Sequence, residues 1–214
     1  MRRGLIYQTL NYPKGVMNHA PTIHVMNKID KILDYWFEGI DDSTAIDIKN
    51  TPFKKWFIKD EKIDQDIREE FESDLIKAGA GEYKKWEETL QGRLALTILF
   101  DQFTRNMYRD TINMYAYDAV AVELTQCTIK EDTDKDLMHI ERAFIYLPLM
   151  HSEDVKLQKQ SVECFTKLVE DAKVSNADNV HYYEYSLKHA KEHHDTVVEF
   201  GRFPHRDAIL GRKN

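Results

Sequence analysis

Apolar residues in this 214-residue chain recur every three or four positions, which is the spacing of one face of an α-helix. The plainest case is the series Ile63, Ile67, Phe71 and Leu75. No run alternates strictly between apolar and polar residues, and the hairpin dipeptides Asn-Gly and Asp-Gly do not occur. The pattern therefore predicts an all-α fold and argues against a sheet.

Capping and breaking residues place the ends of the predicted helices. We expect helical segments at 25–37, 51–57, 63–79, 94–103, 111–126, 137–147, 152–169 and 178–200. Thr111 and Ser152 are expected N-caps, Pro148 is expected to stop one helix, and Gly201 is expected to end the last. Short connections favour antiparallel neighbours, hence stacked helical hairpins. We expect a single all-α domain over residues 22–214, preceded by an irregular N-terminal arm at 1–21.

The charge balance and the cysteines limit the classes of partner. Thirty basic residues against 37 acidic ones give a net charge of −7, and a mainly acidic surface repels phosphate backbones, so no nucleic-acid partner is expected. No apolar stretch has the length of a membrane helix, and the first residues contain no apolar segment of secretory length. Cys127 and Cys164 form no CxxC pair and make no disulfide framework. These features predict a cytoplasmic protein with no membrane partner.

The segment 99–106 places Asp101 and Arg105 on one face of an otherwise apolar helix. Such charges must be paired, because an isolated buried charge is strongly destabilising. Two interpretations stay open: an internal ion pair that fixes how two helices cross, or the floor of a polar cavity in which Arg105 faces an anion. Arg142, beside Glu141 in a second apolar helix, is open to the same two interpretations.

His151 lies between Pro148 and the expected cap Ser152. At the N-terminus of a helix, the positive end of the dipole favours a neutral imidazole that is able to accept a proton. Glu153 or Asp154 is close enough in sequence to orient the ring. The alternatives are a general base and a hydrogen-bonded loop histidine.

Two further groups of basic residues lie near the C-terminus. Arg202, His205 and Arg206 surround a turn fixed by Pro204, where guanidinium groups either bind an anion or cap helix carbonyls. Histidines 189, 193 and 194 include an i, i+4 pair without a matched carboxylate, so a solvated helix face is favoured over a metal site. No glycine-rich phosphate loop, GxSxG element or Cys–His signature is present. We expect no metal and no cofactor.

Three motifs in this order, FDQFTRN, ERAFIYLPLMHSED and FGRFPHR, resemble those of the mainly bacterial domain of unknown function 924 over about residues 29–212. The resemblance implies an all-α fold of the tetratricopeptide-repeat-like group and says little about activity. The positions that match the family pattern are Asp101, Gln102, Arg105, Asn106, Glu141, Arg142, His151, Ser152, Glu153, His193, Gly201, Arg202, Pro204, His205 and Arg206. Four positions depart from it: Thr104 replaces a proline, His194 and Glu199 replace arginines, and Asp207 replaces an asparagine.

Together these residues support a small-molecule site as the first functional hypothesis. An anionic ligand, phosphorylated or carboxylated, would be held by Arg105, Asn106, Arg142, Arg202 and Arg206. The acid–base residues would be His151 and His205, beside Asp101 and Glu153. The alternative is a tetratricopeptide-like interaction module with a protein partner, in which the polar motifs are structural braces. The sequence leaves open whether the protein is an enzyme.

Overall fold

A computed structural model describes residues 27–46, 51–175 and 177–213, and every regular element in these ranges is helical. The α-helices are α1 (Lys28–Phe37), α2 (Thr51–Phe57), α3 (Glu61–Gly79), α4 (Leu90–Thr97), α5 (Thr104–Met107), α6 (Asp118–Lys130), α7 (His139–His151), α8 (Val155–Val174), α9 (Val180–Phe200) and α10 (Asp207–Leu210). The all-α fold class is confirmed. The predicted arm at 1–21 lies outside the described residues.

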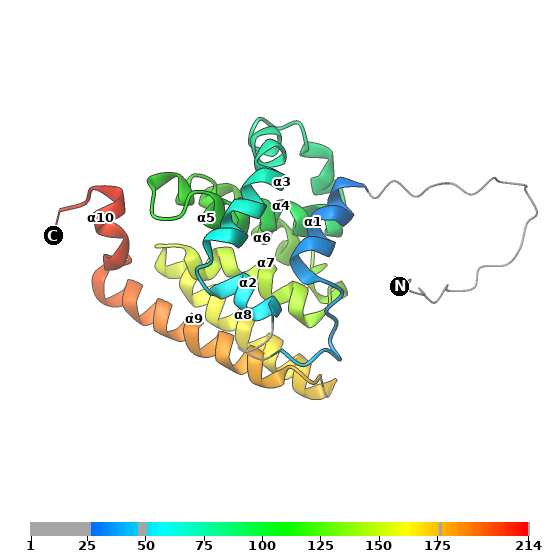
Figure 1. Cartoon of the computed structure of the whole chain (residues 1–214). Coiled ribbons are helices and arrows are strands. Elements are labelled where there is room, and N and C mark those ends of the chain that lie inside the picture. The colour runs from blue at the N-terminus through cyan, green and yellow to red at the C-terminus, as the bar shows by residue number, and fades with distance from the viewer. Residues whose placement is uncertain (1–26, 47–50, 176, 214) are drawn as a thin grey trace, which may run out of the picture.

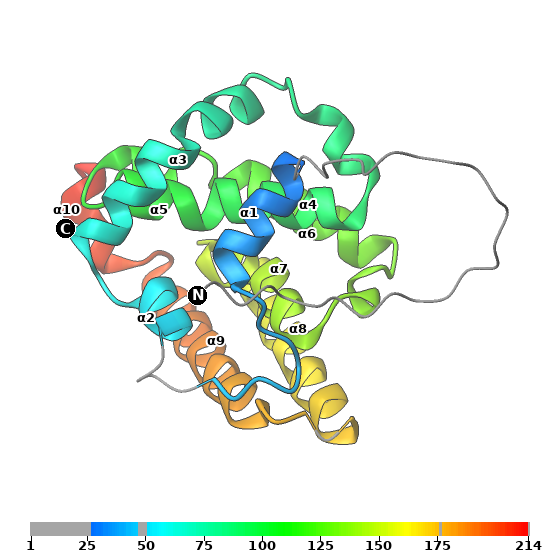
Figure 2. The ribbon, with the colours of Figure 1, turned by 45° about the vertical axis from the view of Figure 1, so that its right-hand side comes forward.

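The helices are arranged around α4, α5 and α7. α4 and α5 follow one another along a line, and α6 and α7 lie beside them (Figure 1). α8 and α9 form a long antiparallel hairpin that packs on α7, while α1 crosses the other side of α4 (Figure 2). α10 follows at the far end of α9 (Figures 1 and 2). This arrangement brings segments from the middle and the end of the sequence to one end of the molecule.

α4 and α5 are joined by a π-helical turn over Ile98–Phe103, so that the chain is helical without a break from Leu90 to Met107. The predicted stripe over 94–103 is buried on all sides, as its composition suggests. The π turn itself is not apparent from the sequence spacing. It is closed at Thr104, whose backbone N–H and Oγ1 both donate to the carbonyl of Leu99, five residues earlier.

The sequence predicts that Pro148 stops its helix. In the structure Pro148 instead lies inside α7. The residues of α7 from Arg142 to Met150 are all buried, so tertiary packing outweighs the loss of about 3 kcal/mol that an internal proline brings. The buried amide of Gln158 supports the last turn, because its Nε2 donates to the carbonyls of Met150 at 2.7 Å and Ser152 at 2.5 Å. His151 is therefore the last residue of α7 rather than a loop residue.

Two predicted caps are also wrong. The N-cap of α8 is Asp154, whose carboxylate accepts from the N–H groups of Lys156 and Leu157, while the Ser152 hydroxyl accepts from the Asp154 N–H. The Thr111 hydroxyl donates to the Tyr108 carbonyl, and a 3-10 turn over Ile112–Tyr115 follows before α6 begins. In both places a short polar side chain forms a local turn that competes with capping. The predicted end of α9 at Gly201, in the left-handed conformation, is confirmed.

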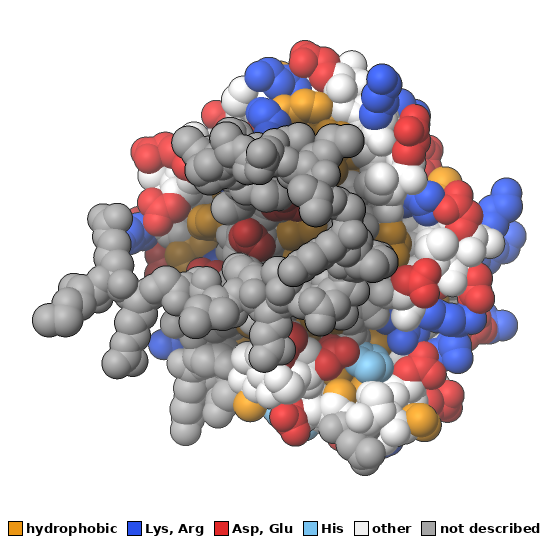
Figure 3. Space-filling view, turned by 90° about the vertical axis from the view of Figure 1, so that its right-hand side faces the viewer, with side chains coloured by type: hydrophobic (Ala, Val, Ile, Leu, Met, Phe, Trp, Pro, Cys, Tyr) orange, Lys and Arg blue, Asp and Glu red, His pale blue; other side chains and the backbone are white. Residues whose placement is uncertain are grey.

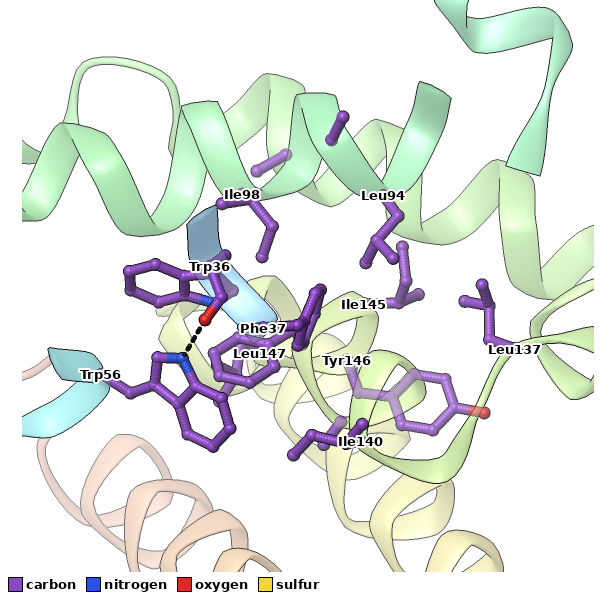
Figure 4. Packing of buried hydrophobic residues seen from close by; sticks show 14 of the residues in the cluster. Trp36, Phe37, Trp56, Leu94, Ile98, Leu137, Ile140, Ile145, Tyr146 and Leu147 are labelled. Atoms are coloured by element: carbon purple, nitrogen blue, oxygen red, sulfur yellow. Dashed lines mark hydrogen bonds between the residues drawn. The ribbon is translucent and has the colours of Figure 1, made fainter. Parts of the chain in front are cut away.

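The buried apolar residues form one contiguous cluster to which all the helices from α1 to α9 contribute. Figure 4 shows Trp36 and Phe37 of α1 against Trp56 of α2, with Ile98, Ile145 and Leu147 from the helices that face them. The Trp56 indole donates to the Trp36 carbonyl at 3.0 Å. Trp36, Phe37 and Trp56 all pack their rings against Phe144, and this aromatic packing holds α1 and α2 against α7.

The outer surface mixes charges of both signs. On the face shown in Figure 3, acidic and basic side chains are interspersed around the described residues. None of the helices in the described part of the chain combines the length and the apolar character needed to cross a bilayer.

Gly92 provides a test of the packing at the start of α4. A Cβ at this position would lie 2.1 Å from the Trp86 carbonyl oxygen, which is backbone and unable to move aside. We expect Gly92→Ala to lower the free energy of unfolding by about 1–3 kcal/mol, although Gly→Ala inside a helix normally raises it by about 0.5–1 kcal/mol. Urea denaturation would measure the change. Gln91→Ala, at an exposed position of the same turn, is the control and should be neutral or slightly stabilising; an equally stable Gly92→Ala variant would contradict the packing.

Candidate functional site

Asp101 and His151 form a hydrogen-bonded pair between the π turn and the end of α7. The distance from Nδ1 of His151 to Oδ1 of Asp101 is 2.7 Å. The sequence predicts that a helix N-terminus and Glu153 or Asp154 control His151, and this is incorrect because the ring lies at a helix C-terminus and is oriented by Asp101. The two residues are 50 positions apart, so only the fold reveals the pair.

Asp101 is ionised although it is completely buried. Burial alone would disfavour the carboxylate, but the charge of Arg105 and the hydrogen bonds from His151 and Gln102 outweigh it and hold the pKa of Asp101 well below its usual range. Nη1 of Arg105 lies 3.0 Å from Oδ1, and Nε2 of Gln102 lies 2.5 Å from Oδ2. An ionised carboxylate only accepts hydrogen bonds, so Nδ1 of His151 must carry the proton. In the neutral ring, Nε2 then has a free lone pair.

Two arginines extend the cluster on the side of Asp101 that faces α6 and the C-terminal segment. Arg105 also pairs with Asp118, the first residue of α6, at 2.9 and 3.0 Å. Arg206 donates to the His151 carbonyl at 2.8 Å and lies 3.7 Å from Asp118. Both guanidinium groups lie over the Tyr115 ring, and burial together with the like charge of Arg105 lowers the pKa of Arg206. The structure thus brings four predicted residues together, and it adds Asp118 and Tyr115, which the sequence analysis did not single out.

Three of the predicted ligand-binding residues lie elsewhere. Asn106 donates to Asp64 of α3 at 2.8 Å, so its side chain faces α3 rather than His151. Arg142, near the other end of α7, pairs with Asp171 at 3.0 Å. Arg202 is bound by Asp207 at 2.8–3.0 Å. Each of these side chains satisfies its charge or hydrogen bonds locally, as in the structural interpretation of the motifs.

Two of the predicted acid–base residues also do not contact the His151 ring. Glu153 accepts from the Phe203 N–H at 2.9 Å and from both terminal nitrogens of Arg212 at 2.9 and 2.7 Å, which ties the C-terminal segment to the start of α8. His205 is exposed, and its ring lies 5.5 Å from that of Phe203. The partial burial of its ring and the charge of Arg206 lower the pKa of His205. Glu153 is therefore a structural contact of the segment that carries Arg206.

A cavity of about 260 Å³ lies next to His151, between α7, α8 and α9, and we call it the His151 cavity. Its apolar lining consists of Phe57, Ala143, Leu147, Met150 and Phe165. Its polar lining consists of His151, Tyr182, Tyr185, Ser186, His189 and His193. None of the predicted arginines is among these residues. The Asp101–His151 pair thus separates a charged cluster on one side from a mainly apolar cavity on the other.

The sequence predicts that the histidines of α9 form a solvated helix face. This is only partly correct, because His189 and His193 line the His151 cavity. The Nδ1 of His193 donates to the His189 carbonyl at 2.8 Å, and burial lowers the pKa of His193 to about 4. His194 points elsewhere and pairs with Asp195 at 3.0 Å. Within the described ranges, no group of three or more His, Cys, Asp or Glu side chains is arranged to hold a metal ion.

Comparison with known proteins places these observations in a family. The model of "Bacterial protein of unknown function (DUF924)" matches residues 32–214. The solved structure of the protein of unknown function ATU0120 from Agrobacterium tumefaciens is similar, with 32% sequence identity and a TM-score of 0.70. The match covers 87% of this chain and 91% of the Agrobacterium chain. Among curated proteins no match was found.

Replacing the buried carboxylate tests its place in the cluster. Asp101→Asn removes the negative charge that faces Arg105 and His151, and we expect the free energy of unfolding at pH 7 to fall by about 3–5 kcal/mol, the range for breaking a buried ion pair. Because the folded pKa of Asp101 is depressed, its stabilisation is present above pH about 4 and is lost as the pH falls further. The variant should therefore lose part of the wild-type acid sensitivity in urea denaturation.

Asp110→Asn is the matched control, because Asp110 pairs with Lys59 on the surface with 70% of its side chain exposed. That change should alter the stability by less than about 0.5 kcal/mol. Equal effects of the two substitutions would show that Asp101 is not the centre of a buried cluster.

The neutral state of His193 predicts a second pH dependence. Its folded pKa of about 4 lies below the unfolded value of about 6.5, so its stabilisation is complete above pH 6.5 and is lost as the pH falls from 6.5 to 4. With allowance for its partial exposure, we expect a loss of about 1–3 kcal/mol over this interval. His193→Gln should flatten the curve, and His194→Gln should leave it unchanged. A wild-type curve that is level over the interval would contradict the assignment.

Proposed function

The chain belongs to the DUF924 family of bacterial proteins of unknown function, and we propose that it binds a small molecule in the His151 cavity, where His151 accepts a proton from the ligand. One observation carries this proposal. The histidine that lines the cavity is held through Nδ1, at 2.7 Å, by a buried and ionised carboxylate. This leaves Nε2 as the ring nitrogen available to a ligand.

The Asp101–His151 pair has the properties of a general base. The carboxylate fixes the ring orientation and the tautomer, and it stabilises the imidazolium that forms when Nε2 takes a proton. The backbone of His151 is held as well, through the bond from Arg206 to its carbonyl and through Gln158 in the last turn of α7. Holding both the ring and the backbone reduces the loss of freedom when a ligand is engaged.

The surroundings of the pair suit a binding site for a small molecule. The cavity walls are mainly aliphatic and aromatic, with a few polar groups, which is the usual composition of small-molecule sites. An apolar wall also strengthens electrostatic interactions at Nε2 by keeping water away.

The anionic ligand predicted from the arginine motifs receives less support from the geometry. Arg105 and Arg206 already face Asp101 and Asp118, and neither lines the cavity. The histidine side of the cluster, rather than its arginine side, is thus the better candidate for ligand binding.

Two further expectations from the sequence are also proposals: a tetratricopeptide-like fold with a function as an interaction module, and a cytoplasmic location. The antiparallel hairpin of α8 and α9 supports the grouping with tetratricopeptide-like folds, and with it the alternative function as an interaction module. The free thiols of Cys127 and Cys164 support a cytoplasmic location.

Selective alkylation tests the proposed site. Phenacyl bromide is small, apolar and uncharged, and a free imidazole nitrogen displaces its bromide. We expect Nε2 of His151 to be alkylated at least about tenfold faster than other histidines, because the cavity binds the reagent next to it. Peptide mass spectrometry after short exposure at pH 7.5 would give the rate at each histidine.

His139 provides an internal control in the same molecule. Its Nδ1 lies 2.7 Å from Asp42, and its side chain is 15% exposed against 19% for His151, but it does not line the cavity. Filling the cavity by Ser186→Phe should abolish the preference for His151, whereas Lys188→Phe on the exposed side of α9 should not. Equal rates at His139 and His151 in the wild type would refute the proposed site.

A further inference from the structure

Two of the three histidines that line the His151 cavity, His151 and His193, use Nδ1 for a local hydrogen bond. The acceptors are the Asp101 carboxylate for His151 and the His189 carbonyl for His193, at 2.7 and 2.8 Å. Neither of these acceptors carries a proton to donate at neutral pH. When the rings of His151 and His193 are neutral, the proton is therefore on Nδ1, and Nε2 is left as a hydrogen-bond acceptor.

His193 keeps this acceptor character over the whole physiological range. Burial, the largest cause, lowers its pKa to about 4, so its ring is neutral at pH 5 and above. A neutral His193 accepts a hydrogen bond at Nε2 and attracts no anion. It is thus a fixed acceptor, unlike His151, which gains a proton when it acts as a base.

The Ser186 hydroxyl, like Nε2 of His193, presents a hydrogen-bond acceptor to the cavity. Its hydrogen is donated to the Tyr182 carbonyl at 3.0 Å, so the oxygen has only lone pairs left for the cavity. Tyr182 and Tyr185 have hydroxyls that both donate and accept hydrogen bonds, so they do not discriminate between donor and acceptor ligands. Among the described residues that line the cavity there is no Lys, Arg, Asp or Glu. The polar lining consequently offers mainly acceptors and no fixed charge.

The size and the walls of the cavity limit the size and the polarity of the ligand. An apolar protein cavity of about 150 Å³ accommodates benzene, so about 260 Å³ has room for a substituted ring or a short branched chain. Phe57, Phe165 and Met150 provide an apolar surface for such a body. A charged group would lose its hydration there without a counter-ion.

We infer that the ligand of the His151 cavity is a small, mainly apolar and uncharged molecule that donates a hydrogen bond through a hydroxyl group, as an alcohol or a phenol does, and that His193 is a second acceptor beside His151. The inference rests on the proposed function of the cavity and names the ligand class for it. It replaces the anion expected from the arginine motifs with a neutral donor.

Competition between three probes of similar shape tests the ligand class. 4-Methylphenol donates a hydrogen bond, 4-methylanisole only accepts one, and 4-methylbenzoate is an anion. Each would be titrated against the alkylation of His151 by phenacyl bromide. We expect 4-methylphenol to protect His151 at a concentration roughly tenfold lower than 4-methylanisole, the effect of one good hydrogen bond, and 4-methylbenzoate to protect least.

Variants of α9 test the role of His193. His193→Phe keeps a ring of similar size but removes the acceptor, so the advantage of 4-methylphenol over 4-methylanisole should shrink several-fold. His194→Phe, one position away and outside the cavity lining, should leave it unchanged. His193→Gln, which retains an acceptor, is a second variant that should restore part of the preference if the phenylalanine variant is unstable.

The outcomes separate the ligand class from the site itself. Better protection by 4-methylbenzoate or 4-methylanisole, or protection by none of the three probes while His151 still reacts selectively, would overturn the ligand class and leave the site standing. An unchanged preference in His193→Phe would overturn the role of His193. Loss of selective alkylation in the wild type would overturn the proposed function before the competition begins.

Discussion

The burial of one carboxylate, that of Asp101, determines how the rest of this site is built. An ionised group without contact to solvent needs charges and hydrogen bonds from every side, and these come from Arg105 and Gln102 on its own helix and from His151 on α7. The helix must therefore approach the end of α7 at this point. The π turn over Ile98–Phe103 lies where this happens, and such turns change the direction of the side chains within a helix.

The same requirement connects the C-terminal segment to the site. Arg105 brings Asp118 into the cluster, Asp118 lies close to Arg206, and Arg206 donates to the carbonyl of His151. Glu153 then holds the backbone of Phe203, so the segment that carries Arg206 is fixed from both sides. Segments that are far apart in sequence thus depend on one another through charge pairing, which explains why three separate motifs occur together in this chain.

The sequence predicts much of the fold and less of the site. Helices whose apolar stripe is unambiguous, such as α3 and α9, are found where the spacing places them, because one face of each must be buried. Pro148 inside α7 was not predictable, since the packing that compensates for it comes from distant residues. At the site, the polar motifs pointed to Asp101, Arg105, His151 and Arg206, but not to Asp118 or to the cavity side of His193. Those partners depend on how α6 and α9 lie against α7, and local spacing contains no information on that.

The balance of charge around His151 explains why proton acceptance and a neutral ligand go together. Arg105 and Arg206 carry two positive charges, and Asp101 and Asp118 carry two negative ones, so the cluster behind a neutral His151 has no excess charge to attract an anion. A proton that moves from a bound hydroxyl to Nε2 creates an imidazolium whose Nδ1 still donates to the Asp101 carboxylate at 2.7 Å. The ligand oxygen that remains is then negative and lies beside the cation it has just formed. A ligand that arrived as an anion would have no proton to give and would meet the acceptor nitrogens of His151 and His193, so the arrangement that makes His151 a base also selects a neutral donor.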